Sequence, residues 1–286
     1  MPRGCVRSPA LNVELIRRIG IFRFFARAAF LRFRKRVLRR DTMLRLPTGR
    51  QMILPRSSQN ASEVYVSNAN IDWGSEALFA SFANADGDLL DVGAHIGYYS
   101  VYLSPLVRRA YAFEPDPRNI VWLQKNANLA GNIEVVALAV SSTNGTAMLH
   151  MGPVTAVSSL ETVGGGSDDM PVATTTVDAF VSSRPDIHVT LMKTDVEGHD
   201  LHALQGARET VARHQPLILT ECNDAMLAGL CDAWDYAIFA FTRNRRTQRT
   251  RFVSMSQADL RDKYYKMLFL VPPRLKARFA EEAVTR

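Results

Sequence analysis

The 286-residue chain contains little cysteine. Its three cysteines, Cys5, Cys222 and Cys231, are odd in number and far apart in the sequence. This scatter excludes a disulfide framework, and it does not match the ligand spacing of a zinc site. Free thiols are typical of a reducing compartment, so we expect a cytoplasmic protein.

Long apolar runs are missing too. The sequence has no stretch of about 18 uninterrupted apolar residues and therefore predicts no transmembrane helix. Hydrophobic residues make up 47% of the chain and charged residues 22%, which is ordinary for a globular protein. At this length the chain can bury a substantial core.

Acidic residues are scarce near the N-terminus. The first fifty residues hold 14 Lys and Arg against 2 Asp and Glu, whereas the remaining 236 hold 21 and 26. Arginines interrupt the apolar residues of segment 11–40, which argues against a secretory signal. Three interpretations of this segment stay open: a helix on an anionic membrane surface at the inner membrane, a basic arm for nucleic acid, and a helix packed on the domain.

The segment 88–117 carries the most information. It predicts a buried strand, a glycine turn, a short helix and a second strand. Asp91 lies near the end of the first strand, Gly93 and Gly97 bracket the turn, and Glu114 ends the second strand. Glycine lets a ligand approach the backbone, and a carboxylate at the next strand end can accept hydrogen bonds from both hydroxyls of a ribose. The segment therefore predicts a nucleotide-type pocket.

The dinucleotide fingerprint Gly-x-Gly-x-x-Gly is absent from this turn. The residues from Asp91 to Gly97 read Asp-Val-Gly-Ala-His-Ile-Gly. They resemble the Asp-x-Gly-x-Asn-x-Gly first motif of S-adenosylmethionine-dependent methyltransferases, with His95 where Asn is common.

Strands and helices alternate along the rest of the chain. This alternation predicts an open, mostly parallel α/β sheet whose ligands bind at the carboxyl ends of the strands. A glycine-rich segment at 164–166 is interpreted as a lid or as a loop without function. The other expected elements are a hairpin at 43–55, helices at 76–83, 117–130 and 201–212, and strands at 133–140, 146–151, 158–161, 189–193, 217–221, 236–241 and 266–271, with a strand running into a helix at 174–180.

Four further segments extend the likeness to methyltransferases. LMKTDVEGHDLHALQGA (191–207), FEP (113–115), TTTVDAF (174–180) and LILTEC (217–222) together resemble the FkbM-type family. The resemblance implies a Rossmann-like class I methyltransferase fold, a seven-stranded, mostly parallel sheet with an antiparallel edge strand. We divide the chain accordingly into a basic helical and β-hairpin extension (1–87), a cofactor-binding methyltransferase domain (88–273) and a C-terminal tail (274–286).

The resemblance also implies chemistry. The cofactor would be S-adenosylmethionine, and the acceptor a hydroxyl of a sugar, glycolipid or polyketide-like small molecule. The residues expected to bind the cofactor are Asp91, Gly93, His95, Gly97, Glu114, Pro115 and Ala139. Besides His95, the sequence departs from the family pattern at Asp200, where Glu is usual.

Methyl transfer to a hydroxyl requires alignment of the reacting atoms and a proton acceptor. Asp195, Glu197 and His199 are the catalytic candidates, and Asp195 comes first because it lies directly at a strand end. Glu197 and His199 have a second interpretation, as caps on the N-terminus of the following helix. Lys193 would pair with a site carboxylate or extend from the sheet edge.

A divalent metal is possible but not expected. Asp195, Glu221 and Asn223 offer the oxygen ligands that a hard cation prefers, yet the chain has no dense acidic loop.

Other functions compete with O-methylation. A nicotinamide-dependent oxidoreductase is disfavoured by the missing glycine fingerprint. A nucleic-acid methyltransferase is disfavoured because the motif is TDVEG and not an Asn/Asp-Pro-Pro-aromatic sequence, so we expect no nucleic-acid partner. A membrane-surface protein with a degenerate cofactor pocket is the non-enzymatic alternative.

Deletion of residues 1–40 is expected to abolish binding to anionic liposomes and to spare cofactor binding, because the basic and aromatic side chains lie on the deleted segment. Liposome co-sedimentation and titration calorimetry measure the two properties. Liposome binding that survives the deletion would exclude the surface-helix interpretation.

Overall fold

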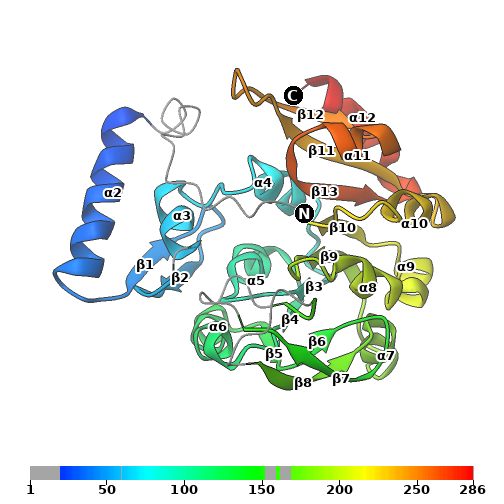
Figure 1. The fold of residues 1–286 in the computed structure, drawn as a ribbon, viewed down its shortest axis with the longest axis horizontal. Helices are drawn as coiled ribbons and strands as arrows, with labels where there is room; N and C mark the ends of the chain where they lie inside the picture. Colours follow the sequence, from blue (N-terminus) through cyan, green and yellow to red (C-terminus); the bar gives the residue numbers. More distant parts are fainter. Residues whose placement is uncertain (1–19, 59, 152–158, 162–168, 286) are drawn as a thin grey trace.

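An eight-stranded sheet forms the centre of the computed structural model, which describes residues 20–58, 60–151, 159–161 and 169–285 (Figure 1). The strand order is β12-β11-β13-β10-β9-β3-β4-β5. The strands are β3 (Asp88–Val92), β4 (Arg109–Phe113), β5 (Ile133–Val136), β9 (Val189–Thr194), β10 (Leu217–Thr220), β11 (Ala237–Arg243), β12 (Thr250–Ser254) and β13 (Tyr265–Val271). From β10 to β5 neighbouring strands are parallel, whereas β13 is antiparallel to both β10 and β11. The expected α/β class is confirmed, with one strand more than expected because β12 forms a hairpin with β11.

Both faces of the sheet are apolar. Leu89 and Leu191 belong to the core cluster on one face, while the next residues, Leu90 and Met192, belong to the cluster on the other. This double burial is why the central strands are continuous apolar runs. The first face is covered by α4 (Ser75–Ala80), α5 (Tyr98–Leu103), η1 (Ser104–Leu106) and α6 (Pro117–Ala130), the second by α7 (Val177–Ser182), α8 (Asp200–Gln205), α9 (Arg208–His214) and α10 (Leu227–Ala233) (Figure 1).

The expected hairpin is confirmed as β1 (Thr42–Arg45) and β2 (Gln51–Leu54), followed by α3 (Asn60–Val66). Met52 and Leu54 are fully buried in the cluster of the first sheet face. Asn126 of α6 fixes the hairpin: its Nδ2 donates to Ile53 O at 3.1 Å, and its Oδ1 accepts from Ile53 N at 2.7 Å. This part of the N-terminal extension is therefore continuous with the core.

Helix α2 (Ile21–Arg36) is attached by a few contacts. Leu31 is buried, Arg27 Nε donates to Tyr65 O at 2.9 Å, and Lys35 Nζ donates to Ser58 O at 2.7 Å. Phe22 stays 88% exposed and Phe25 53%. The helix thus packs in part and also presents aromatic side chains to its surroundings; the rest of segment 11–40 before residue 20 lies outside the described residues. No helix in the described ranges is long and apolar enough to cross a bilayer.

The expected strand at 133–140 is wrong as a single element. It breaks into β5 and β6 (Ala139–Val140). Val136 O accepts from Glu114 N at the end of β4 and also from Leu138 N. After this point the chain leaves the sheet. Strand β6 joins a separate three-stranded sheet with β8 (Met170–Thr175) and β7 (Gly145–Leu149). The strand expected at 158–161 is reduced to a bridge between His150 and Ser159, and segment 164–166 lies outside the described residues.

The helix expected at 201–212 also breaks in two, α8 and α9. A Cβ on Gly206 would lie 2.2 Å from Ser141 O, so the chain passes too close to a neighbouring loop for a side chain here. Asp178 then caps the new helix, because its carboxylate accepts from Glu209 N at 3.1 Å and from Thr210 N at 2.8 Å.

The C-terminal residues expected to form a tail are instead structured. After α11 (Gln257–Asp262) and β13, η3 (Pro273–Leu275) leads into α12 (Lys276–Thr285). Phe279 of α12 is fully buried, with its ring centroid 5.5 Å from that of Phe269 and 6.0 Å from that of Phe252. The last helix therefore completes the apolar core on the first sheet face.

Phe279→Ala is expected to lower the free energy of unfolding by roughly 3–5 kcal/mol, because it leaves a cavity among aromatic rings. Urea denaturation measures this loss. Val284→Ala on the same helix is the control, since Val284 is 87% exposed and its truncation should change stability by less than about 0.5 kcal/mol. Equal effects of the two substitutions would contradict the packing of α12.

Candidate functional site

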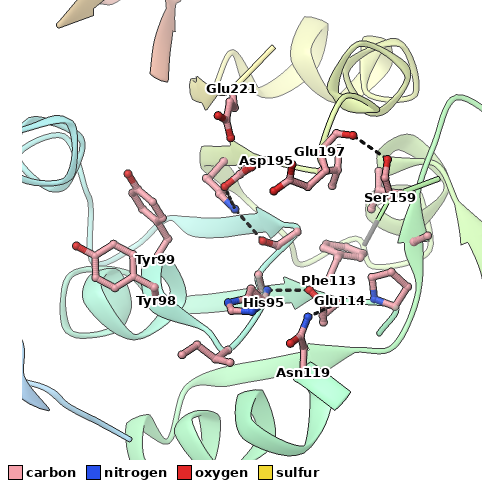
Figure 2. A pocket seen from close by; sticks show the side chains of 18 of the residues that line it. His95, Tyr98, Tyr99, Phe113, Glu114, Asn119, Ser159, Asp195, Glu197 and Glu221 are labelled. Carbon is pink, nitrogen blue, oxygen red and sulfur yellow. Dashed lines mark hydrogen bonds and ion pairs between the residues drawn. The ribbon is translucent and has the colours of Figure 1, made fainter. Parts of the chain in front are cut away.

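A cavity of about 290 Å³ lies at the carboxyl ends of β3, β4 and β9 (Figure 2). Its volume is near the lower end of the ~300–1,000 Å³ usual for small-molecule pockets. Five of the seven residues predicted to bind a cofactor line it: Gly93, His95, Glu114, Pro115 and Ala139. The carboxylates of Asp195, Glu197 and Glu221 lie on one side, and Glu114 with Asn119 on the other (Figure 2).

The other two predicted residues, Asp91 and Gly97, do not line the cavity. They stabilise the glycine turn between β3 and α5. Asp91 is fully buried, and its Oδ2 accepts from Ser100 N at 2.9 Å and Ser100 Oγ at 2.6 Å. These bonds hold the start of α5 against the end of β3. Gly97 precedes α5 with φ of 90°, and a Cβ there would lie 2.8 Å from Leu123 Cδ1.

Gly93 makes the closest backbone contact at the site. Its φ is +76°, and a Cβ on this residue would lie 2.0 Å from Asp195 O. Any side chain would therefore push the ends of β3 and β9 apart. The carbonyl of Gly93 accepts from Lys193 Nζ at 2.8 Å.

His95 occupies a left-handed backbone conformation, with φ of 54°. Asn, Asp and His are the non-glycine residues most often found there, which explains how His95 replaces the Asn of the related motif. Its N–H donates to Glu114 Oε2 at 2.8 Å. Burial, followed by the nearby charge of Lys193, lowers the pKa of the imidazole to about 4, so the ring is neutral at pH 7.

Glu114 is held at the end of β4 by hydrogen bonds to both carboxylate oxygens. Besides the bond from His95, its Oε1 accepts from Asp116 N at 2.9 Å and from Asn119 Nδ2 at 3.2 Å. The residue is 6% exposed yet lines the cavity. Burial raises the pKa of its carboxyl to about 7 despite these bonds.

Lys193 pairs with two carboxylates, one of the two alternatives expected for it. Its Nζ lies 3.6 Å from Asp91 Oδ1 and 3.6 Å from Asp195 Oδ2. Burial opposes ionisation of Asp195, but the charge of Lys193 together with hydrogen bonds from Glu221 and Lys193 lowers the pKa of this carboxyl. Burial, followed by the charge of Asp195, raises the pKa of Glu221.

The other two catalytic candidates are placed differently from each other. Glu197 lines the cavity, and its carbonyl accepts from Ser159 Oγ at 2.7 Å. His199 is not among the lining residues: its Nδ1 lies 2.7 Å from Glu161 Oε1, and its Nε2 lies 2.9 Å from Ser141 Oγ. The His199 side chain makes no capping bond to α8 either.

The three residues considered as metal ligands do not all line the cavity. Asp195 and Glu221 line the cavity, but Asn223 does not. In the part of the chain that the structure describes, Glu161, His199 and His202 place their ligand atoms within 4.8 Å of one another. Both ring nitrogens of His199 have protein partners, Glu161 and Ser141.

The cavity-lining residues that the sequence analysis does not predict include Asp72, Tyr99 and Lys266. Tyr99 Oη donates to Asp72 Oδ2 at 2.7 Å, and Lys266 Nζ lies 4.0 Å from Asp72 Oδ1. No motif or periodicity singles out Asp72, and its polar-aromatic surroundings are the single local signal.

Comparisons with known proteins identify a family and a curated relative. The family model described as Methyltransferase FkbM domain matches residues 91–246. A hexuronic acid methyltransferase of Haloferax volcanii is 31% identical over 130 residues, which cover 45% of this chain and 53% of the relative. The chain thus spans about half the length of that curated relative.

Two solved structures align with this chain. A methyltransferase FkbM from Methylobacillus flagellatus aligns with a TM-score of 0.42 and 16% identity, covering 91% of this chain and 60% of the other. A TrmK methyltransferase of M. capricolum, solved with S-adenosylhomocysteine, aligns with a TM-score of 0.38 and 15% identity, covering 69% of this chain and 67% of the other.

The family match spans more than half of the chain and contains the glycine turn, Glu114 and the Lys193–Asp195 pair. The chain belongs to the FkbM methyltransferase domain family.

Proposed function

We propose that this protein transfers a methyl group from S-adenosylmethionine to a hydroxyl of a sugar or a sugar-containing small molecule. The observation that carries the proposal is the position of Glu114, a buried carboxylate on the cavity wall beside the glycine turn. Family membership supports methyl transfer, and the name of the Haloferax volcanii relative supports a sugar acceptor.

The residues present fit the cofactor. The Glu114 carboxylate is an acceptor for two ribose hydroxyls, as expected for a carboxylate at the end of the second strand. Phe113, Pro115 and Leu138 line the cavity next to it and offer an apolar surface for a purine ring. At the other side, Asp195 offers a negative charge to the ammonium of a methionine tail.

Bound S-adenosylmethionine would supply an electrophilic methyl group on a sulfonium. The protein would then have to align the acceptor oxygen and accept its proton. Asp195 suits the second task because Lys193 keeps it ionised, and the same carboxylate faces the cavity. Glu197 is the second candidate on this wall, whereas His199 would act through Glu161 and Ser141 and not by contact with the acceptor.

Two alternatives predict different ligands. A nicotinamide-dependent oxidoreductase would bind NAD or NADP, and a membrane-surface protein with a degenerate pocket would bind no cofactor at all. Titration calorimetry with S-adenosylmethionine, S-adenosylhomocysteine, NAD and NADP separates them. Binding of a nicotinamide cofactor alone would overturn the methyl-transfer proposal.

We also propose that the protein is cytoplasmic and associates peripherally with a membrane through segment 11–40. The exposed Phe22 and Phe25 of α2 support it, because they flank Arg23 on a helix with little burial. Aromatic side chains next to arginine suit the boundary of an anionic lipid surface.

Replacement of Glu114 tests the ribose contact. Glu114→Gln keeps the shape but replaces a carboxylate with an amide, so S-adenosylmethionine affinity should fall by about 1–3 kcal/mol. In the wild type, protonation below the pKa of about 7 removes acceptor capacity. Affinity should therefore fall about tenfold from pH 8 to pH 6, and the Glu114→Gln variant should not show this dependence. Calorimetry at both pH values measures this; unchanged affinity of the variant would contradict the pocket.

Replacement of Asp195 tests the proton acceptor. Asp195→Asn should lower kcat by about 10²–10⁴-fold, while Lys193 remains paired with Asp91. The assay measures S-adenosylhomocysteine release and the mass gain of methyl hexosides. Asp86→Asn, which removes an exposed carboxylate, is the matched control. A kcat of the Asp195→Asn variant equal to that of the control would remove Asp195 from the mechanism.

A further inference from the structure

One part of the cavity wall is built by residues outside the family match of 91–246. Glu63 comes from α3, Asp72 from the segment before α4, and Lys266 from β13. If the proposed function holds, cofactor binding belongs to the matched region. The choice of acceptor then depends on this second set of residues.

Asp72 is held in the wall of the cavity. It is 8% exposed, and its Oδ2 accepts from Tyr99 Oη at 2.7 Å. Its backbone is fixed as well, because Glu76 Oε1 accepts from Ile71 N at 2.6 Å and from Asp72 N at 2.9 Å. A carboxyl group anchored in this way is preorganised for a ligand.

Nearby carboxylates already balance the positive charges of both lysines of the cavity wall. Lys266 Nζ donates to Ile71 O at 2.8 Å and to Glu63 Oε1 at 3.3 Å, with Asp72 4.0 Å away. Lys193 lies between Asp91 and Asp195. Within the described part of the wall, each lysine therefore has carboxylate partners of its own and offers little charge to an incoming anion.

Carboxyl groups dominate the described lining. It contains six acidic residues, Glu63, Asp72, Glu114, Asp195, Glu197 and Glu221, and two lysines. Burial raises the pKa of Asp72, and the charge of Asp195 raises it further although Lys266 opposes both. These two carboxyl groups thus repel each other, and a third negative charge nearby would increase the cost. An ionised carboxylate can accept hydrogen bonds but not donate them, so ligand hydroxyls are its natural partners.

We infer that the acceptor is an uncharged sugar whose hydroxyls donate to Asp72 and Asp195, and that a sugar carboxylate is rejected from this part of the cavity. This inference rests on the proposed function and narrows it. It also separates this chain from the relative whose name specifies hexuronic acid. Repulsion by Asp72 would supply the discrimination, since juxtaposed like charges cost several kcal/mol.

Matched acceptors test the inference. The methyl glycosides of glucose, galactose and mannose are each compared with the corresponding methyl hexuronide, which differs by a carboxylate in place of the C6 hydroxymethyl group. The wild type should methylate at least one hexoside with a kcat/KM about tenfold or more above that of its uronide. A uronide preferred by the wild type would overturn the inference, as would the absence of turnover of every hexoside.

Two substitutions identify the residues responsible. Asp72→Asn should lower kcat/KM for the hexoside about tenfold and raise it for the uronide, because a repulsive charge is removed. Lys266→Gln, on a half-buried side chain, should lower kcat/KM for the uronide further and so increase the selectivity. Asp86→Asn should leave the ratio unchanged. A uniform loss in Asp72→Asn, with the ratio constant in Lys266→Gln, would overturn the inference.

Failure of this inference can be distinguished from failure of the proposed function. Calorimetric binding of S-adenosylmethionine with methylation of uronides would leave the proposed function intact and reject the neutral acceptor. Absence of S-adenosylmethionine binding would reject both.

Discussion

The ammonium group of Lys193 determines how the ends of β3 and β9 meet. Its Nζ donates to Gly93 O and lies 3.6 Å from both Asp91 and Asp195, in a side chain that is only 4% exposed. A buried charge is unfavourable unless other groups compensate it, so the two strand ends must supply carboxylates and a carbonyl at this point. Gly93 permits that approach, since any Cβ would collide with the Asp195 carbonyl. The turn, the cavity and the ionised Asp195 all follow from this junction.

The same junction gives the carboxyl groups of one sheet edge different properties. Burial raises the pKa of Glu114 to about 7, because no lysine lies beside it and backbone amides compensate only part of the cost. Asp195 is also buried in part, yet Lys193 lowers its pKa. The Glu114 carboxyl therefore titrates near pH 7, whereas Asp195 remains an anion that can accept a proton. Their separation across the cavity lets both act on one bound molecule.

The sequence predicts those parts of the structure that depend on local pattern. The unit from β3 through α5 to β4 is apolar on both strand faces and has glycine where the backbone requires it, so Gly93, Glu114 and Asp195 could be located in advance. The break at Gly206 and the burial of Phe279 depend on contacts with residues distant in sequence, which no periodicity reveals. Asp72 and Lys266 could not be found for the same reason: they meet at the cavity through packing of the N-terminal extension on the sheet.

The cavity wall combines residues from inside the family match with residues from outside it. Glu114 and the glycine turn lie within 91–246, whereas Asp72 and Lys266 lie before and after it. The hydrogen bonds to the Glu114 carboxylate in the described part of the chain come from His95, Asp116 and Asn119. Under the proposed function, the charge at Asp72 and Lys266 can therefore change without altering the contact of Glu114 with a ribose. One cofactor pocket of this kind would then be compatible with acceptors of opposite charge, and the flanking segments would decide which of them can enter.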